Sequence, residues 1–355
     1  MTALYERVFD VPAGTEGRAP ARANLLGEHT DYNDGFVLPM PLAYQTAVAI
    51  GLMEGAPDGI VEAHAAPFRE TKRRSVSDPP QGDWMDYVAG CFWALGQAGY
   101  SIPAVRLAIE SDVPMGAGIS SSAALEVAVL RAARRLLDLP LDGAELARLG
   151  QRAENAYVGM QCGIMDQMAA SLGQKGKALF LDTRTMATEA VPLPEGHRFA
   201  IIHCGKAHQL TAGDYNTRRR ECEAACAALR IGSLRDFDID DLDRLERLEE
   251  PLGRRARHVV TENRRVLEGV AALKAGDAES FGRLMDESHR SQRDDYQVSI
   301  PEIDALVEAA KRHGAIGARL TGGGFGGSIV ALVPSGRYDG WRDAVLADRP
   351  DAREI

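Results

Sequence analysis

The 355-residue chain lacks several features that would place it in a large class of proteins. No apolar run approaches the roughly 18 residues that a membrane-spanning helix needs, so no membrane association is expected. The opening segment, MTALYERVFDVPAG, has acidic residues and no apolar core, which predicts no secretion signal. There is no dense basic run, and 51 Asp plus Glu outnumber 41 Lys plus Arg. An acidic chain of this kind is a poor candidate for nucleic-acid binding.

Cysteine is also scarce, and its placement excludes two further classes. The five cysteines are odd in number, are scattered, and form no C-x-x-C pair: Cys91, Cys162, Cys204, Cys222 and Cys226. A disulfide framework and a structural zinc site are therefore not expected. The natural compartment for such a chain is the reducing cytoplasm.

What the chain does contain is an ordinary globular composition, with 45% hydrophobic and 26% charged residues. The length predicts about two lobes, each with its own core. Apolar runs at 36–40 and 46–52 predict strands. The polar stretch 65–83 predicts a loop that leads to a helix from about Trp84, and the stretch 183–197, rich in proline and small residues, predicts a lobe junction. Strands and helices mix without strict alternation, so we expect an α+β fold rather than a doubly wound parallel sheet.

The most informative segment is PMGAGISSSAAL, residues 114–125. Its glycines permit a tight turn, and three serines then begin a helix whose free N–H groups and positive dipole end suit an anion, above all phosphate. The alternative is an ordinary serine-capped helix after a turn. Two better-known phosphate motifs are excluded, because there is no G-x-x-x-x-G-K-[ST] and the third glycine of the dinucleotide fingerprint is missing.

A second polar segment, APARANLLGEHTDYNDG at residues 19–35, brings Arg, Glu, His and Asp close together in the sequence. Clustered carboxylates and an imidazole suit a polyhydroxyl ligand, because each sugar hydroxyl can donate to a carboxylate. A solvated turn with caps on either side explains the same composition. Composition alone leaves both readings open.

Together these motifs resemble the GHMP kinase superfamily and, within it, the galactokinase family. RANLLGEHTDYNDGFVLPMPL is similar to the galactokinase signature, PMGAGISSSAALEVA to the superfamily's ATP loop, and LTGGGFGGSIVAL to its C-terminal glycine motif. CGIMDQMAASLGQKGKALFLD, DYNTRRRECEAA and SHRSQRDDY are similar to further galactokinase segments. The resemblance covers nearly the whole chain in the family's order.

The resemblance implies transfer of the γ-phosphoryl group of ATP to O1 of α-D-galactose with Mg²⁺, so the expected partners are a small sugar and ATP. The chain is expected to be a monomer in the cytoplasm. It implies a ribosomal S5 domain 2-like N-terminal lobe, residues 1–185, which holds the sugar loop and the ATP loop. A ferredoxin-like C-terminal lobe, residues 186–355, is expected to hold the glycine motif. Two rivals remain open. One is a related sugar 1-kinase acting on galactosamine, N-acetylgalactosamine or another sugar, and the other is a non-catalytic sensor of galactose and ATP.

Site residues follow from the resemblance by motif match. Asp166 matches the catalytic base, and Arg22 matches the arginine beside it. Asp166 is also expected in the first turn of a short helix between Gly163 and Gly173, where the dipole favours a carboxylate. The remaining matches are the sugar contacts Glu28, His29, Thr30, Asp31, Gly163 and Tyr215, the phosphate loop Gly116, Ala117, Gly118, Ile119, Ser120, Ser121 and Ser122, and the Mg²⁺ ligands Ser122 and Glu154.

Each of these roles has a plainer alternative. Asp166 could be a helix-capping aspartate, and Glu154 a solvated charge on a helix. The glycine-rich segment 320–328 permits close backbone approach, either against the ATP loop and phosphates or in a purely structural turn.

Overall fold

The computed structural model describes residues 1–206 and 212–355, and within it the chain forms two compact units. Unit 1 consists of Met1–Arg22, Leu42–Val113 and Ser120–Leu172, and unit 2 of Ala23–Pro41, Pro114–Ile119 and Gly173–Ile355. These boundaries differ from a single division between residues 185 and 186. Two early segments, which hold the sugar-loop motif and the glycine turn before the serines, pack with the later part of the chain.

Unit 1 is built on a five-stranded sheet of order β1-β3-β6-β4-β5. Its strands are β1 (Thr15–Asn24), β3 (Pro39–Leu52), β4 (Ile60–Ala65), β5 (Glu70–Ser75) and β6 (Val105–Ser111). Strands β4 and β6 are parallel, and the other described pairings are antiparallel. The expectation of a loop over 65–83 was wrong at β5. This edge strand pairs only with β4 and keeps most of its polar side chains accessible, so it carries no apolar signal.

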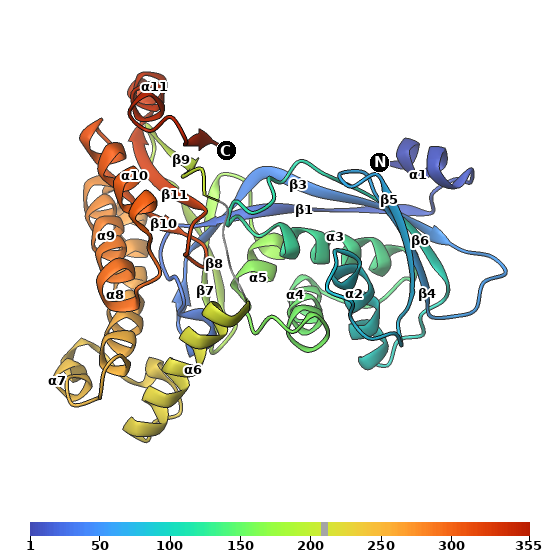
Figure 1. Ribbon diagram of the computed structural model, residues 1–355, viewed down its shortest axis with the longest axis horizontal. Coiled ribbons are helices and arrows are strands. Elements are labelled where there is room, and N and C mark those ends of the chain that lie inside the picture. The colour runs from blue at the N-terminus through green and yellow to red at the C-terminus, as the bar shows by residue number, and fades with distance from the viewer. Residues whose placement is uncertain (207–211) are drawn as a thin grey trace. The chain divides into compact units, whose positions relative to one another are not determined.

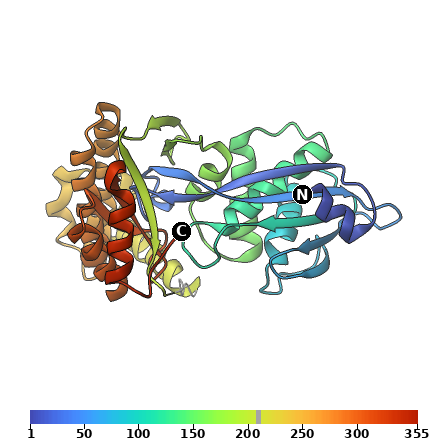
Figure 2. The same ribbon diagram turned by 90° about the horizontal axis from the view of Figure 1, so that it is seen from above.

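Helices cover both faces of this sheet. On one face lie α2 (Met85–Gln97), α3 (Ser121–Leu136) and α4 (Gly143–Arg152), and their apolar side chains pack with strand residues such as Val48 and Ile50 (Figure 1). On the other face lies α1 (Thr2–Phe9), whose Tyr5 packs against Ala49 (Figure 2). Ala49 stands between Val48 and Ile50 in β3. This alternation is the period-two pattern of a strand covered on both sides. A π-helical turn, Ala153–Val158, continues α4, and α5 (Met165–Leu172) follows as the short helix that the sequence predicts.

Unit 2 contains two antiparallel sheets. The larger has the order β10-β11-β9-β12, with β9 (His197–His203), β10 (Gly317–Thr321), β11 (Ser328–Pro334) and β12 (Arg353–Glu354). The smaller has the order β2-β7-β8, with β2 (Phe36–Val37), β7 (Lys177–Asp182) and β8 (Thr188–Pro192). The stretch 183–197 is therefore not an irregular junction throughout, because β8 lies within it.

The helices of unit 2 stack beside the larger sheet, where α8 packs on α9 and α9 packs on β10 (Figure 1). They are α6 (Ala212–Leu229), α7 (Leu242–Leu245), α8 (Leu252–Ala275), α9 (Ala278–Ser291), α10 (Pro301–Arg312) and α11 (Tyr338–Asp348), and a π-helical turn, Gln292–Tyr296, ends α9. Short 3₁₀ turns cover Asp31–Asn33, Leu234–Asp236, Ile239–Asp241 and Ser335–Arg337. No helix of the described residues is long and apolar enough to cross a membrane. The mixture of sheets and helices confirms the α+β class.

Candidate active site

The centre of the unit 1 site is a fork between Arg22 and Asp166. Arg22, near the end of β1, is 4% exposed, and Asp166 stands in the first turn of α5. The Nε of Arg22 donates to Oδ1 of Asp166 at 2.7 Å, and Nη2 donates to Oδ2 at 2.8 Å. A bidentate, charge-assisted pair of this kind fixes both the position and the plane of the carboxylate. The structure therefore brings together the two residues to which the sequence gives a catalytic role.

Ser120 is the third member of this group. It occupies the N-cap position of α3 in a left-handed conformation, with φ of 62°, but makes no side-chain capping bond. Its hydroxyl instead donates to Oδ2 of Asp166. The plain reading of this serine as a helix cap therefore does not hold, because the capping atom is turned toward Asp166. Ser121 begins α3, and Gly163 is buried two residues before α5.

Behind this group lies a buried acidic cluster. Ser122 hydrogen-bonds the carboxylate of Glu154, which sits in the π-helical turn. Burial, with the nearby charge of Asp166, raises the pKa of Glu154 to about 7. Glu154 is only 7% exposed, so it is not the solvated helix charge that the sequence left open. Among the described residues, no group of three or more His, Cys, Asp or Glu side chains is arranged to hold a metal ion.

Two members of this cluster escaped the sequence analysis. The amide nitrogen of Gln167 donates to Glu126 Oε2 at 3.0 Å and to Glu154 Oε2 at 2.8 Å, so one amide bridges two buried carboxylates. Burial and the charge of Glu154 raise the pKa of Glu126 well above its usual range. The available signal was a glutamate on the apolar face of α3, between Ala123 and Val127. A charge at such a position is rarely buried without a partner.

In unit 2 the polar segment forms a tight loop after β1. Glu28 is 2% exposed and accepts hydrogen bonds from Asn24 Nδ2 at 2.7 Å and from the Gly322 N–H at 2.6 Å. The Thr30 hydroxyl is turned into the loop, within hydrogen-bond distance of the Gly27 and Phe36 carbonyl oxygens. Asp31 begins a 3₁₀ turn and accepts from the backbone N–H of Tyr32. The loop is thus ordered by internal bonds rather than solvated.

A chain of hydrogen bonds fixes the tautomer of His29. Its Nε2 lies 3.1 Å from the carbonyl oxygen of Gly323, which only accepts, so Nε2 carries the proton. In the neutral ring Nδ1 then accepts from the Tyr32 hydroxyl at 2.8 Å. Tyr32 in turn accepts from Tyr296 at 2.7 Å, which leaves Tyr296 to accept from the Cys222 thiol at 3.2 Å. Burial raises the pKa of Cys222 to about 12, so this thiol keeps its proton.

Tyr215 of α6 lies beside this chain. Its ring centroid is 5.2 Å from that of His29 and 5.5 Å from that of Tyr32. These are ordinary distances for tilted and edge-on ring pairs. Unit 2 therefore groups three of the sequence-predicted sugar contacts, namely Glu28 and His29 of the loop and Tyr215 of the helix.

The glycine-rich segment approaches the phosphate turn within unit 2. A Cβ added at Gly322, where φ is +88°, would come within 2.5 Å of the Gly118 carbonyl oxygen. The Ser328 hydroxyl donates to the carbonyl oxygen of Ala117 at 2.7 Å. Gly116 and Gly118 have positive φ, while the side chains of Ala117 and Ile119 are buried. Close backbone approach is therefore what these glycines permit, as the sequence indicated.

Comparison with known protein families agrees with this arrangement of the phosphate turn, the polar loop and the glycine-rich segment. The family described as GHMP kinases N terminal domain matches residues 86–174, and GHMP kinases C terminal matches residues 270–346. The galactokinase galactose-binding signature matches residues 3–52. The fold and these matches define a GHMP kinase.

The most informative relatives are galactokinases. A galactokinase of Roseiflexus sp. (strain RS-1) is 48% identical over 344 residues, which cover 94% of this chain and 87% of that protein. The crystal structure of Lactococcus lactis galactokinase complexed with galactose is 34% identical, has a TM-score of 0.93, and is matched over 100% of this chain and 96% of its own. Methanococcus jannaschii mevalonate kinase, 17% identical with a TM-score of 0.71 over 97% of this chain and 98% of its own, shares the fold.

The chain belongs to the galactokinase family. It is therefore an ATP-dependent sugar kinase, and the family, fold and enzyme class expected from the sequence are confirmed.

Proposed function

We propose that this kinase phosphorylates α-D-galactose at O1, giving galactose 1-phosphate and ADP. The observation that carries the proposal is the Arg22 fork on Asp166, because it holds a carboxylate in one orientation at the start of a helix. Asp166 accepts the proton of the O1 hydroxyl as the new O1–P bond forms and the bond from the γ-phosphorus to ADP breaks. Phosphoryl transfer with a loose transition state needs little early proton removal, so orienting the hydroxyl is the larger part of this role.

Arg22 has a second role in this proposal. Its guanidinium is positioned to stabilise negative charge that develops on the transferred phosphoryl group. Glu28, His29, Asp31 and Tyr215 contact sugar hydroxyls, and the turn from Gly116 to Ser122 binds the ATP phosphates. Thr30 and Gly163 shape the backbone near these contacts, since one is bonded into its own loop and the other is a buried glycine.

Mg²⁺ fits the Ser122 and Glu154 pair. A hydroxyl and a carboxylate oxygen are hard donors, and Mg²⁺ in kinases is typically held by one or two protein oxygens together with phosphate and water. Burial and the nearby charge of Asp166 raise the pKa of Glu154, and a divalent cation bound at this carboxylate would supply the opposite charge. Bound there, Mg²⁺ would neutralise charge on the ATP phosphates.

The proposed setting is a monomer in the cytoplasm, and the five free thiols suit a reducing compartment.

The test is an ADP-release assay of the purified protein with Mg-ATP over a panel of sugars. Galactose is expected to give the highest kcat/KM, because a polar site loses much affinity when a hydroxyl contact is missing. A higher kcat/KM for galactosamine, N-acetylgalactosamine or another sugar would show that galactose is not the preferred substrate, while the assignment as a sugar kinase would stand. No ADP release with any sugar, alongside measurable ATP binding, would indicate a sensor. Asp166→Ala is expected to abolish turnover while ATP binding persists.

A further inference from the structure

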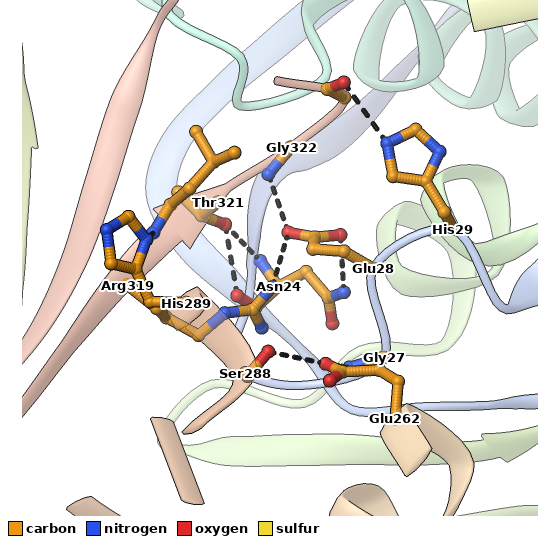
Figure 3. A network of polar contacts seen from close by, with 12 residues as sticks. Asn24, Gly27, Glu28, His29, Glu262, Ser288, His289, Arg319, Thr321 and Gly322 are labelled. Carbon is orange, nitrogen blue, oxygen red and sulfur yellow. Dashed lines mark hydrogen bonds and ion pairs between the residues drawn. The ribbon is translucent and has the colours of Figure 1, made fainter. Parts of the chain in front are cut away.

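Arg319 of β10 is the most unusual charged residue of unit 2. It has 0% exposure and is among the largest fully buried side chains of the described chain. Within the described residues, none of its three guanidinium nitrogens has a hydrogen-bond partner. Its Nη2 lies 3.4 Å from Glu28 Oε1, an ion-pair distance. Figure 3 shows the guanidinium pointing toward Glu28, with the Glu262 carboxylate also nearby.

A buried cation with unmade hydrogen bonds is costly unless its charge is needed. Glu262 also feels this charge: burial works to raise its pKa, but the positive charges of Arg265 and Arg319 hold it low. Its oxygens already accept from Arg265 Nε at 2.7 Å, the Gly27 N–H at 2.8 Å and the Ser288 hydroxyl at 2.7 Å. Arg265 lies three residues away on the same helix and pairs with Glu262 directly. Arg319 therefore compensates two buried carboxylates, and of these Glu28 is the one that lies at ion-pair distance and has no arginine beside it on its own segment.

Glu28 has neutral donors on both carboxylate oxygens, namely the Asn24 amide on Oε2 and the Gly322 N–H on Oε1. Neutral donors orient a buried carboxylate but compensate its charge less than a cation does. Arg319 adds a positive charge on the Oε1 side. Arg319 therefore adds charge compensation to a carboxylate that is only 2% exposed.

The same strand also fixes the position of the loop that carries Glu28. Residues two apart in a strand face the same side, so Arg319 and Thr321 both face the loop. The Thr321 hydroxyl donates to the Asn24 carbonyl oxygen at 3.0 Å and accepts from the Asn24 N–H at 3.0 Å. With the Gly322 N–H on Glu28, these bonds attach Thr321 and the residue after it to Asn24 and Glu28 (Figure 3).

We propose that Arg319 is a positioning residue for sugar recognition, whose charge holds the buried Glu28 carboxylate in place so that it can accept a sugar hydroxyl. This inference rests on the proposed function, in which Glu28 contacts the sugar. Arg319 acts through Glu28 and does not itself touch the substrate. Replacing the Arg319 side chain therefore weakens sugar binding and leaves nucleotide binding unchanged.

The test compares Arg319→Met, which keeps the length of the side chain without its charge, with Arg319→Lys, which keeps the charge without the planar fork. Arg319→Met is expected to raise the galactose KM by roughly 10- to 100-fold, the effect of losing one charge-assisted contact, with the ATP KM within about twofold of wild type. Arg319→Lys is expected to fall between wild type and Arg319→Met. If Arg319→Met does not fold, the Arg319→Lys comparison decides alone.

Two controls separate positioning from stability. Arg74 of unit 1 is a buried arginine, 4% exposed, that pairs with Asp83 and Asp86, so Arg74→Met is expected to lower the melting temperature without changing the galactose KM. In a Glu28→Gln background, Arg319→Met is expected to change the galactose KM by less than about threefold, because the charge on which it acts is gone.

An unchanged galactose KM in Arg319→Met or in Arg319→Lys, or full additivity with Glu28→Gln, would overturn the inference while the proposed function stands. Wild-type protein that releases no ADP with any sugar would overturn the proposed function, and the inference with it.

Discussion

Replacing Arg22 by lysine tests the geometry at the centre of the proposed site. Arg22 makes two charge-assisted bonds to Asp166, at 2.7 and 2.8 Å, and its side chain is 5% exposed. A lysine ammonium is a point charge, so it can replace one of these bonds but cannot set the plane of the carboxylate. One lost bond of this kind amounts to about 1.5 kcal/mol or more, which corresponds to roughly tenfold in kcat.

Arg22→Met removes both bonds and leaves the Ser120 hydroxyl on Asp166. The expected loss is about 3 kcal/mol, or more than roughly a hundredfold in kcat. The assay is steady-state ADP release at saturating galactose and Mg-ATP, so that binding defects do not enter kcat.

The matched control is Arg18→Lys. Arg18 lies on the same strand, its side chain is 47% exposed, and it pairs with Glu16, so its replacement should leave kcat unchanged. If Arg22→Lys keeps kcat within about twofold of wild type, or if Arg18→Lys loses as much, the planar fork is not what orients Asp166.

Three further changes follow from the structure. Burial lowers the pKa of His258 from 6.5 to about 4, so the unfolded chain binds an extra proton between these values. Stability is therefore unaffected by this group above pH 6.5 and falls by roughly 2–3 kcal/mol between pH 6.5 and pH 4.5, as the unfolded chain takes up the proton. Urea unfolding at pH 7.5 and 4.5 should therefore show a smaller difference for His258→Gln than for wild type, and equal differences would contradict this. Ser122→Ala should weaken ADP binding roughly tenfold with Mg²⁺ but not with EDTA in calorimetry, and equal weakening in both would remove Ser122 from the Mg²⁺ site. Gly322→Ala should destabilise the fold by about 2–3 kcal/mol, because its φ is positive and its Cβ would meet the Gly118 carbonyl oxygen, whereas Gly336→Ala, with open space around it, should not. Thermal unfolding of the two alanine variants checks this, and equal melting temperatures would refute it.

Local elements with a strong pattern could be predicted from the sequence. The short helix between Gly163 and Gly173 is α5, because two glycines mark its ends and apolar residues occupy its buried side. The helix that begins at the serines is α3. The strands β5 and β8 were missed because they are edge strands whose side chains are mostly accessible, and those of β5 are also polar. Such strands form through pairing with a neighbour, which local composition does not report.

The contents of the site were predictable only as residue types. Motifs predicted Arg22, Asp166, Glu28 and His29 as site residues, but not which residues hold them in place. Arg319 and Glu28 meet because β10 packs on a loop near the other end of the chain, and the neighbouring Asn24–Thr321 bonds join residues 297 positions apart. No local pattern in the sequence predicts a contact between residues so far apart. Ser120 was ambiguous for another reason, since its left-handed backbone, rather than its residue type, turns the hydroxyl away from the helix end.

The discontinuous make-up of unit 2 has a consequence for how this protein is made. Unit 1 is complete once residue 172 has been synthesised, whereas the loop that carries Glu28 and His29 leaves the ribosome early and waits for β10, which begins at Gly317. Contacts between residues so far apart in the sequence form slowly and late in folding. Nascent chains released before that strand emerges lack the partners of the loop, and they also lack Ser328, which bonds the turn at Ala117, so neither segment is fixed until the end of synthesis.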